Sequence, residues 1–180
     1  MTEAGPDVSA RLAWPDDADA ISTLQLGGWR ESFGDVIDAD ALAELDPERI
    51  AAQWAALITS PPDARVRALV ALDRISIRGF VLVHPSSDPD ADPVADGEIG
   101  EFSVDPAHRE AGHGSRLVNA AVDTLRSDRF TRALWWVDST DDALRAFVTG
   151  SGWEADGAHR ELATPTGATI KQVRLHTSLE

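Results

Sequence analysis

The sequence contains no cysteine and no tyrosine, and only one of its 16 basic residues is a lysine, Lys171. Without cysteine the chain can have no disulfide framework, no thiolate metal site and no cysteine nucleophile. No apolar run approaches the roughly 18 residues that a membrane-spanning helix needs, and no basic segment followed by an apolar run opens the sequence. We therefore expect a cytoplasmic protein that does not enter a membrane.

Positive charge is scarce throughout, with 16 basic residues against 31 acidic ones and a net charge of −15. Such a surface repels nucleic acid and anionic lipid at long range, so neither is expected as a partner. Two interpretations of the acidic surface remain. It can reflect solubility and a general bias toward Asp, Ala and Arg, or it can surround a pocket for a cationic substrate.

With 180 residues, of which 43% are hydrophobic, the chain is expected to form one domain over residues 1–180, frayed at 1–7. The aspartate- and proline-rich stretch 85–97 predicts an acidic mobile loop. Hydrophobic spacing predicts an α/β (α+β) protein with helices on a mixed, mainly antiparallel sheet. The expected order is strand 8–14, helix 15–33, a helical region 38–60 broken near Pro47, hairpin 64–86, strand 98–104, helix 113–127, strand 132–139, helix 140–152, and strands 153–162 and 168–176.

Two glycines, Gly112 and Gly114, stand where a strand has ended and a helix is about to begin. The first amides of a helix have no internal partners and carry a partial positive charge, so this arrangement favours phosphate binding. The alternative is a plain tight turn. A P-loop is excluded because Ser115-Arg116 replaces its Lys-Ser/Thr pair, and a dinucleotide fingerprint is excluded because Leu117 occupies its third glycine position.

The stretch "VDPAHREAGHG" resembles the core motif of the GNAT N-acetyltransferases, in which a hydrophobic residue, any residue and Pro precede Arg/Gln-x-x-Gly-x-Gly/Ala. The similarity extends upstream to "RLAWPDDADAISTLQLGGWRESFGD", which includes Trp29–Gly34, and downstream to "LWWVDSTDDALRAFVTGSGW". It therefore covers nearly the whole chain. The residues in register are Val104, Pro106, Arg109, Gly112, Gly114, Phe147, Gly152 and Trp153. The resemblance implies a GNAT fold of six to seven strands and about four helices, with strands 98–104 and 132–138 splayed apart.

The same resemblance implies an acyl-CoA N-acyltransferase with acetyl-CoA as its co-substrate and no metal. The pyrophosphate would lie on the loop, the pantetheine along the strand before it, and the thioester carbonyl near the amide of Ser103 or Val104, an oxyanion position. Asp141 takes the place of a family asparagine, and Arg116 and Arg145 are further candidates for the CoA phosphates. The implied cofactor residues are Phe102, Ser103, Val104, Arg109, Glu110, Ala111, Gly112, His113, Gly114, Ser115 and Asp141.

The proton-transfer groups depart from the family pattern. The tyrosine that often protonates the leaving thiolate corresponds to Val148, so Ser139 or a water would have to replace it. Strand alternation places Glu98 and Glu101 on opposite faces, so that only one of them can serve as the base. We slightly prefer Glu98. Asp138 is a third candidate, and His84 a fourth that better fits a surface role.

The acceptor implied by the resemblance is a primary amine of a small molecule or peptide, with Trp29 and Phe33 as candidate substrate contacts. Two alternatives stay open. One is a catalytically weak or inactive CoA-binding module that acts as a sensor or partner-binding subunit. The other is an acyltransferase that uses a longer acyl-CoA, because valine at 148 leaves more space than tyrosine. Because members of the family are often dimers, the resemblance also allows a homodimer, although no segment of the sequence indicates an interface.

Overall fold

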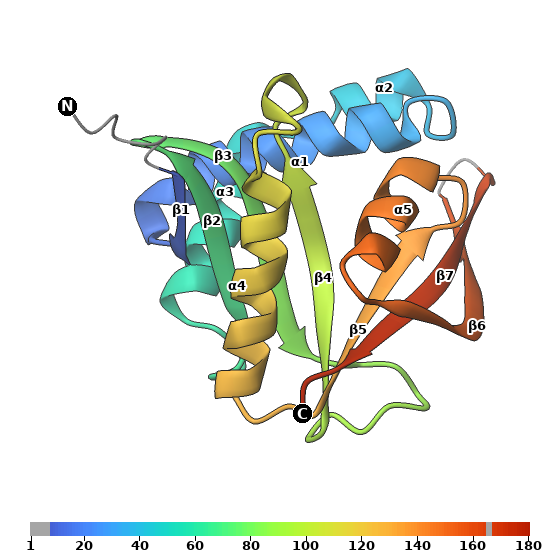
Figure 1. Ribbon diagram of the computed structural model, residues 1–180. Coiled ribbons are helices and arrows are strands. Elements are labelled where there is room, and N and C mark those ends of the chain that lie inside the picture. The colour runs from blue at the N-terminus through green and yellow to red at the C-terminus, as the bar shows by residue number, and fades with distance from the viewer. Residues whose placement is uncertain (1–7, 165–166) are drawn as a thin grey trace.

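The computed structural model describes residues 8–164 and 167–180, so the expected frayed segment 1–7 lies outside the described residues. The chain forms one mixed sheet of seven strands with helices on both faces, and the prediction of an α/β fold is confirmed (Figure 1). The strands are β1 (Val8–Leu12), β2 (Arg67–Asp73), β3 (Ser76–Pro85), β4 (Asp96–Val104), β5 (Arg132–Asp138), β6 (Glu154–Ala163) and β7 (Thr169–Ser178). The helices are α1 (Ala18–Phe33), α2 (Ala39–Ala43), α3 (Pro47–Thr59), α4 (His113–Ser127) and α5 (Asp142–Gly150), with 3-10 turns at Pro15–Asp17 and Pro106–His108.

The strand order is β1-β2-β3-β4-β5-β7-β6, and every neighbouring pair except β4 and β5 is antiparallel. The parallel pairing of β4 with β5 joins Asp96–Ile99 to Arg132–Trp135 and then stops. From Glu101 to Val104, β4 therefore keeps its partner β3 but has none on the β5 side. Figure 1 shows the two strands diverging toward the end at which α4 begins, which confirms the predicted splay.

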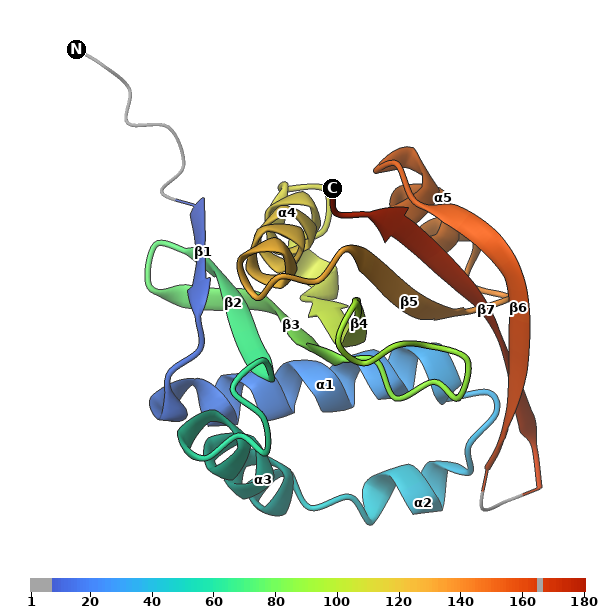
Figure 2. The ribbon, with the colours of Figure 1, turned by 90° about the horizontal axis from the view of Figure 1, so that it is seen from below.

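Two apolar cores lie on the two faces of the sheet. α4 and α5 cover one face, where Val81, Ile99, Leu117 and Trp135 are buried together. α1 and α3 cover the other face over β2 and β3, where Ile21, Trp54, Val70 and Phe80 are buried. Seen from below, α1 runs along this second face and α2 and α3 lie beyond it (Figure 2).

Local signals explain most element ends. Asp46 caps α3 by accepting a hydrogen bond from the Glu48 amide at 3.0 Å, and Pro47 fits the first helical position, so the predicted break in 38–60 is confirmed. The first strand ends at Leu12 rather than residue 14, and Pro15–Asp17 is a 3-10 turn rather than helix. Asp17 accepts from the amide of Trp14 at 2.7 Å there, which tightens the turn before α1.

The stretch 85–97, expected to be an acidic mobile loop, begins and ends inside β3 and β4 and is tied to the sheet between them. Arg174 on β7 donates to Asp90 at 2.7 and 2.8 Å and to Asp88 at 3.2 Å. Trp136 on β5 donates to Asp88 at 2.8 Å. The loop therefore reaches across β5 to β7 (Figure 2), and these contacts oppose free movement.

Candidate active site

The glycine loop 109–114 lies at the carboxyl end of β4, beyond the point where β4 and β5 separate. Gly112 has φ 84°, a left-handed conformation that favours glycine. A Cβ there would lie 2.6 Å from Nη1 of Arg116, so a larger residue would also displace that guanidinium. The first backbone hydrogen bond of α4 runs from the Arg116 amide to the Gly112 carbonyl. The amides of residues 113–115 therefore have no partner within the helix, as phosphate binding requires.

Positive side chains surround this loop. Arg116 donates to the Ala111 carbonyl at 3.2 Å, which holds its guanidinium against the loop. Arg109 forms a bidentate ion pair with Glu31 on α1, with Nη1 2.7 Å from Oε1. The Glu31 carboxylate raises the pKa of Arg109 through these hydrogen bonds. This exposed ion pair joins α1 to the loop.

His113 differs from the other loop residues because its side chain is buried. Burial is the main cause that lowers the pKa of His113, and the charge of Arg116 adds to it. Its imidazole therefore favours the neutral form and contributes little charge. Of the predicted cofactor residues on the loop, His113 can serve through its amide, whereas Arg109, Glu110, Ala111 and Ser115 are exposed.

The unpaired edge of β4 lies beside aromatic side chains. Phe102 stacks on Phe147 of α5 with ring centroids 6.3 Å apart, and Gly114 approaches both rings, since a Cβ on it would lie 3.4 Å from Phe147 and 3.6 Å from Phe102. Alternate backbone groups of an extended strand point away from its one neighbour, so residues 100–104 offer donors and acceptors toward the gap. The predicted residues Phe102, Ser103 and Val104 thus share one edge that ends at the loop. The structure thus brings this strand edge and the loop together at one end of β4; that they bind the cofactor stays a prediction.

The predicted opposite facing of Glu98 and Glu101 is wrong. Leu82 on β3 pairs with Glu101 and Val83 pairs with Ile99, so Gly100 has no partner and forms a bulge. One extra residue reverses the alternation. Ile99 and Phe102 both pack on the α4 side, and both glutamates lie on the α1 side. A glycine inside a strand pattern is the sequence signal that could have revealed the bulge.

The two carboxylates have different surroundings. Glu98 is buried and accepts a hydrogen bond from Ser86 Oγ at 2.8 Å, on the part of β4 still paired with β5. Glu101 lies beyond the bulge, beside the gap, and hydrogen-bonds with Gln25 of α1. Burial raises the pKa of Glu101 against the opposing effect of that hydrogen bond. Gln25, which the sequence did not single out, also accepts from Trp54 Nε1 at 2.8 Å, so its position is defined.

The other predicted residues are distributed around this centre. Trp29 and Phe33 follow Gln25 at four-residue spacing on α1 and are half-buried, so they continue the stripe that contacts Glu101. Asp138 accepts from Gln172 at 3.0 Å, and Asp141 caps α5 by accepting from the Leu144 amide at 2.9 Å. These two carboxylates therefore have structural partners.

Two residues at the end of β5 and on α5 bear on the missing tyrosine. Ser139, half-buried, follows β5 and accepts through its carbonyl from Arg145 at 3.0 Å. Val148 is fully buried in the core on the α4 and α5 face. It therefore adds no open space to the gap, which disfavours the idea that valine makes room for a longer acyl chain.

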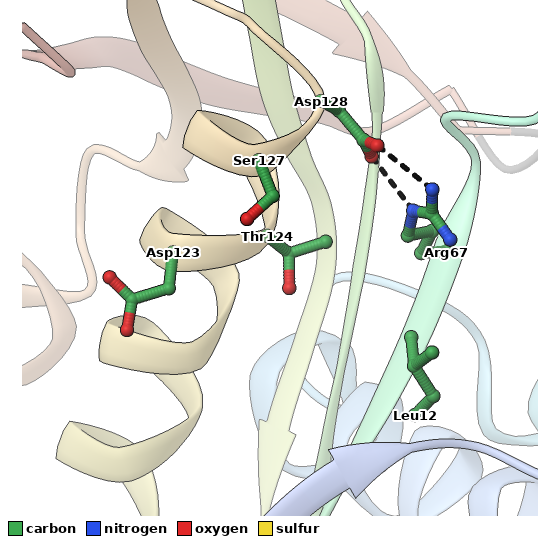
Figure 3. Close-up of a pocket in the computed structure, with 6 residues that line it drawn as sticks. All are labelled: Leu12, Arg67, Asp123, Thr124, Ser127 and Asp128. Carbon is green, nitrogen blue, oxygen red and sulfur yellow. Dashed lines mark hydrogen bonds and ion pairs between the residues drawn. The ribbon is translucent and has the colours of Figure 1, made fainter.

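The hollow drawn in Figure 3 is separate from this centre. It lies between α4 and the start of β2, where Arg67 and Asp128 form two hydrogen bonds of 2.8 Å. Leu12 and three side chains of α4 complete its lining. Because it contains neither the glycine loop nor Glu101, we do not assign it a role in the chemistry.

Within residues 8–164 and 167–180, no three acidic or histidine side chains come together as metal ligands. Among the helices in those same residues, none is both long enough and apolar enough to cross a bilayer.

Comparisons with known proteins agree with the geometry. The family model of the acetyltransferase (GNAT) family matches residues 31–153. Comparison with curated protein sequences gives no match. Similar solved structures include ribosomal-protein-alanine N-acetyltransferase from Brucella melitensis, at TM-score 0.74 and 17% identity over 94% of this chain and 98% of that one. An N-acetyltransferase from Staphylococcus aureus Mu50 aligns at TM-score 0.73 and 11% identity over 97% and 99% of the two chains.

The Salmonella typhimurium protein yncA, whose structure contains its cofactor acetyl-CoA, aligns at TM-score 0.71 and 17% identity over 96% of this chain and 94% of that one. At these identities the solved structures show the fold alone, whereas the family model covers more than half of the chain. The glycine loop, the splayed strands and the family match agree, and the chain belongs to the acetyltransferase (GNAT) family.

Proposed function

We propose that this protein is an N-acetyltransferase that transfers acetyl from acetyl-CoA to a primary amine of a small molecule or peptide. The observation that carries the proposal is the alignment of three features along β4: the bulge beside Glu101, the edge left unpaired after Ile99, and the glycine loop at its end. The amides of residues 113–115 with Arg116 would hold the pyrophosphate, and the edge at Phe102–Val104 would hold the pantetheine. When bound, acetyl-CoA supplies an acetyl thioester.

Glu101 is the proposed base. An acceptor ammonium must lose a proton before its nitrogen can attack a thioester carbonyl, and a carboxylate whose pKa burial raises is better matched to that task at neutral pH. Glu98 is less suited because Ser86 already donates to it and β5 still covers that part of β4. This choice replaces the slight preference for Glu98. As the C–S bond breaks, its electron pair leaves with the sulfur.

The acceptor end of the site favours an amine. Glu98 and Glu101 both face α1, and Trp29 and Phe33 continue the stripe of α1 that begins at Gln25. Carboxylates beside aromatic rings attract cations.

The second candidate is a CoA-binding module without efficient catalysis. It is favoured by the absence of tyrosine and by Val148, which is fully buried where the family places its acid. A thiol is a tolerable leaving group because its pKa is about 8.5, so loss of the acid slows the reaction without preventing it. Ser139 or a water remains the proposed substitute.

Replacing Gly112 by aspartate should abolish most binding of acetyl-CoA. The change adds a negative charge where the pyrophosphate would lie, places a side chain at φ 84° and displaces the guanidinium of Arg116 from the loop. Loss of one hydrogen bond to a charged group costs about 1.5–3 kcal/mol, which is about 10- to 150-fold in affinity. Calorimetric titration with acetyl-CoA measures the change.

Gly157→Asp is the matched control, because Gly157 on β6 has φ 87°, open space around it and the same added charge. Equal weakening by both variants, or no binding by the unaltered protein at millimolar acetyl-CoA, would contradict the proposed loop site. Release of thiol from acetyl-CoA with ethanolamine, spermidine or an alanine-led peptide then separates the acetyltransferase from the binding module. A protein that binds acetyl-CoA but releases no thiol with any amine is the module.

A further inference from the structure

His84 lies on the same face as Glu98 and Glu101, although sequence reasoning favoured a surface role for it. On β3, His84 pairs with Glu98 and Leu82 pairs with Glu101. Directly opposed side chains on an antiparallel pair lie on one face, so the imidazole stands at the level of the bulge that separates the two glutamates. The ring is half-buried and remains accessible to solvent.

The bulge leaves room for the imidazole over the backbone of β4. A Cβ on Gly100 would lie 2.5 Å from His84 Nε2 and 2.9 Å from Cδ2, which is closer than atoms can approach. Only a residue without a side chain lets the ring lie there. Gly100 therefore has two effects: it reverses the alternation that brings Glu101 to this face, and it accommodates the Nε2 edge of His84.

A hydrogen bond assigns the tautomer of this ring. His84 Nδ1 lies 2.7 Å from the carbonyl oxygen of Pro85. A carbonyl oxygen can only accept, so Nδ1 carries the hydrogen and donates it. In the neutral ring Nε2 then has a free lone pair, and Nε2 is the ring atom nearest to the bulge.

We propose that His84 Nε2 is a second proton acceptor of this site, beside Glu101; the inference rests on the proposed acetyl transfer. An acceptor ammonium loses two protons in all. The first leaves before attack and goes to Glu101. The second leaves the nitrogen of the tetrahedral intermediate as the C–S bond breaks, and we assign it to His84 Nε2. One proton finally joins the CoA thiolate and the other enters solvent, so the reaction balances.

Glu98 supports this assignment. Glu98 is paired across the strands with His84, and a hydrogen bond from Ser86 Oγ at 2.8 Å holds its carboxyl group in place. Glu98 is thus a positioning residue rather than the base. The titratable groups that face His84 from β4 are Glu98 and Glu101.

The test is His84→Asn, because an asparagine amide can keep the donated hydrogen bond to the Pro85 carbonyl but has no counterpart of Nε2. With acetyl-CoA and an amine from the same set of probes, kcat should fall about tenfold or more while KM for acetyl-CoA stays unchanged. Gly100→Ala, which displaces the ring, should reproduce part of the loss. His159→Asn, at an exposed position on β6, should leave kcat unchanged.

An independent readout is the nitrogen NMR spectrum of 15N-labelled protein without ligand, with the His84 signals assigned by their loss in His84→Asn. We expect the tautomer protonated at Nδ1. A neutral ring protonated at Nε2 would overturn the proposal, as would an unchanged kcat in His84→Asn when the unaltered protein is active. No thiol release by the unaltered protein with any amine would instead overturn the proposed function, and the role of His84 with it.

Discussion

Replacing Glu101 by glutamine is expected to lower kcat by about 10²- to 10⁴-fold, the contribution typical of a positioned general base. Glutamine keeps the shape of the side chain and its contact with Gln25 but cannot accept the ammonium proton. In the unaltered protein, kcat should fall as the pH falls through the raised pKa of Glu101. In Glu101→Gln this decrease of kcat at low pH, the acidic limb of the pH profile, should disappear. Measuring kcat against pH with saturating acetyl-CoA and one active amine tests both statements.

Glu98→Gln is the matched variant, since Glu98 lies on the same strand and face. We expect it to lower kcat less than Glu101→Gln and to keep the acidic limb, because Glu98 acts through His84. If Glu98→Gln removed the limb and Glu101→Gln retained it, the assignment of the base would be reversed.

Replacing Glu101 by glutamine should raise the stability of the fold, although it lowers kcat. Because the pKa of Glu101 is raised in the folded state, the folded protein binds the proton more tightly than the unfolded chain does. The resulting stability is fully present below the ordinary glutamate pKa of about 4.3 and is lost as pH rises through the raised value. Glu101→Gln should therefore raise the melting temperature more at about pH 8 than at about pH 4. An equal difference at both pH values would contradict the burial argument.

Arg174→Met is expected to reduce the free energy of unfolding by about 3–5 kcal/mol, because it breaks a buried cluster of charges. The Arg174 side chain is 7% exposed and lies among Asp88, Asp90 and Asp156, with Nε 2.6 Å from Asp156 Oδ2. The side chains of Asp88 and Asp156 are only 10% and 14% exposed. Removing the guanidinium leaves Asp156 poorly solvated and without the guanidinium that donates to it, and leaves Asp88 with Trp136 at 2.8 Å and the more distant Arg160 at 3.9 Å. The three carboxylates also raise the pKa of Arg174, so it is charged at every working pH.

Chemical unfolding in urea measures this loss, with Lys171→Met as the control. Lys171 lies on the same strand and forms an ion pair of 3.8 Å with Glu161. The side chains of Lys171 and Glu161 are 69% and 62% exposed. Such surface pairs contribute about 0–1 kcal/mol. Similar losses in both variants would mean that the cluster on Arg174 does not hold loop and sheet together. Arg174→Met should also free the loop at Asp88 and Asp90, seen as faster amide exchange in residues 86–95.

The arrangement on Arg174 illustrates why some features escape sequence reasoning. Asp88 and Arg174 are 86 residues apart, and neither belongs to a recognisable motif. Taken alone, an acidic stretch with prolines has the composition of a mobile loop. Its partners come from β5 and β7, which approach it only when the sheet has formed. The placement of Gln25 against Glu101 has the same origin, since α1 must first cross β4.

Local chemistry explains what the sequence by itself determined. The start of α4 at residue 113, the break before Pro47 and the hairpin between β2 and β3 follow from caps, prolines and apolar spacing, which act within a few residues. The glycine loop and its likeness to the GNAT motif were visible for the same reason. The tertiary structure alone decided that Glu98 and Glu101 both face α1 and that only Glu101 lies beside the gap. It also placed His84 on the same face and buried Val148. Each depends on the bulge at Gly100 or on packing between distant elements, and one unpaired residue in a strand reverses every side chain that follows it.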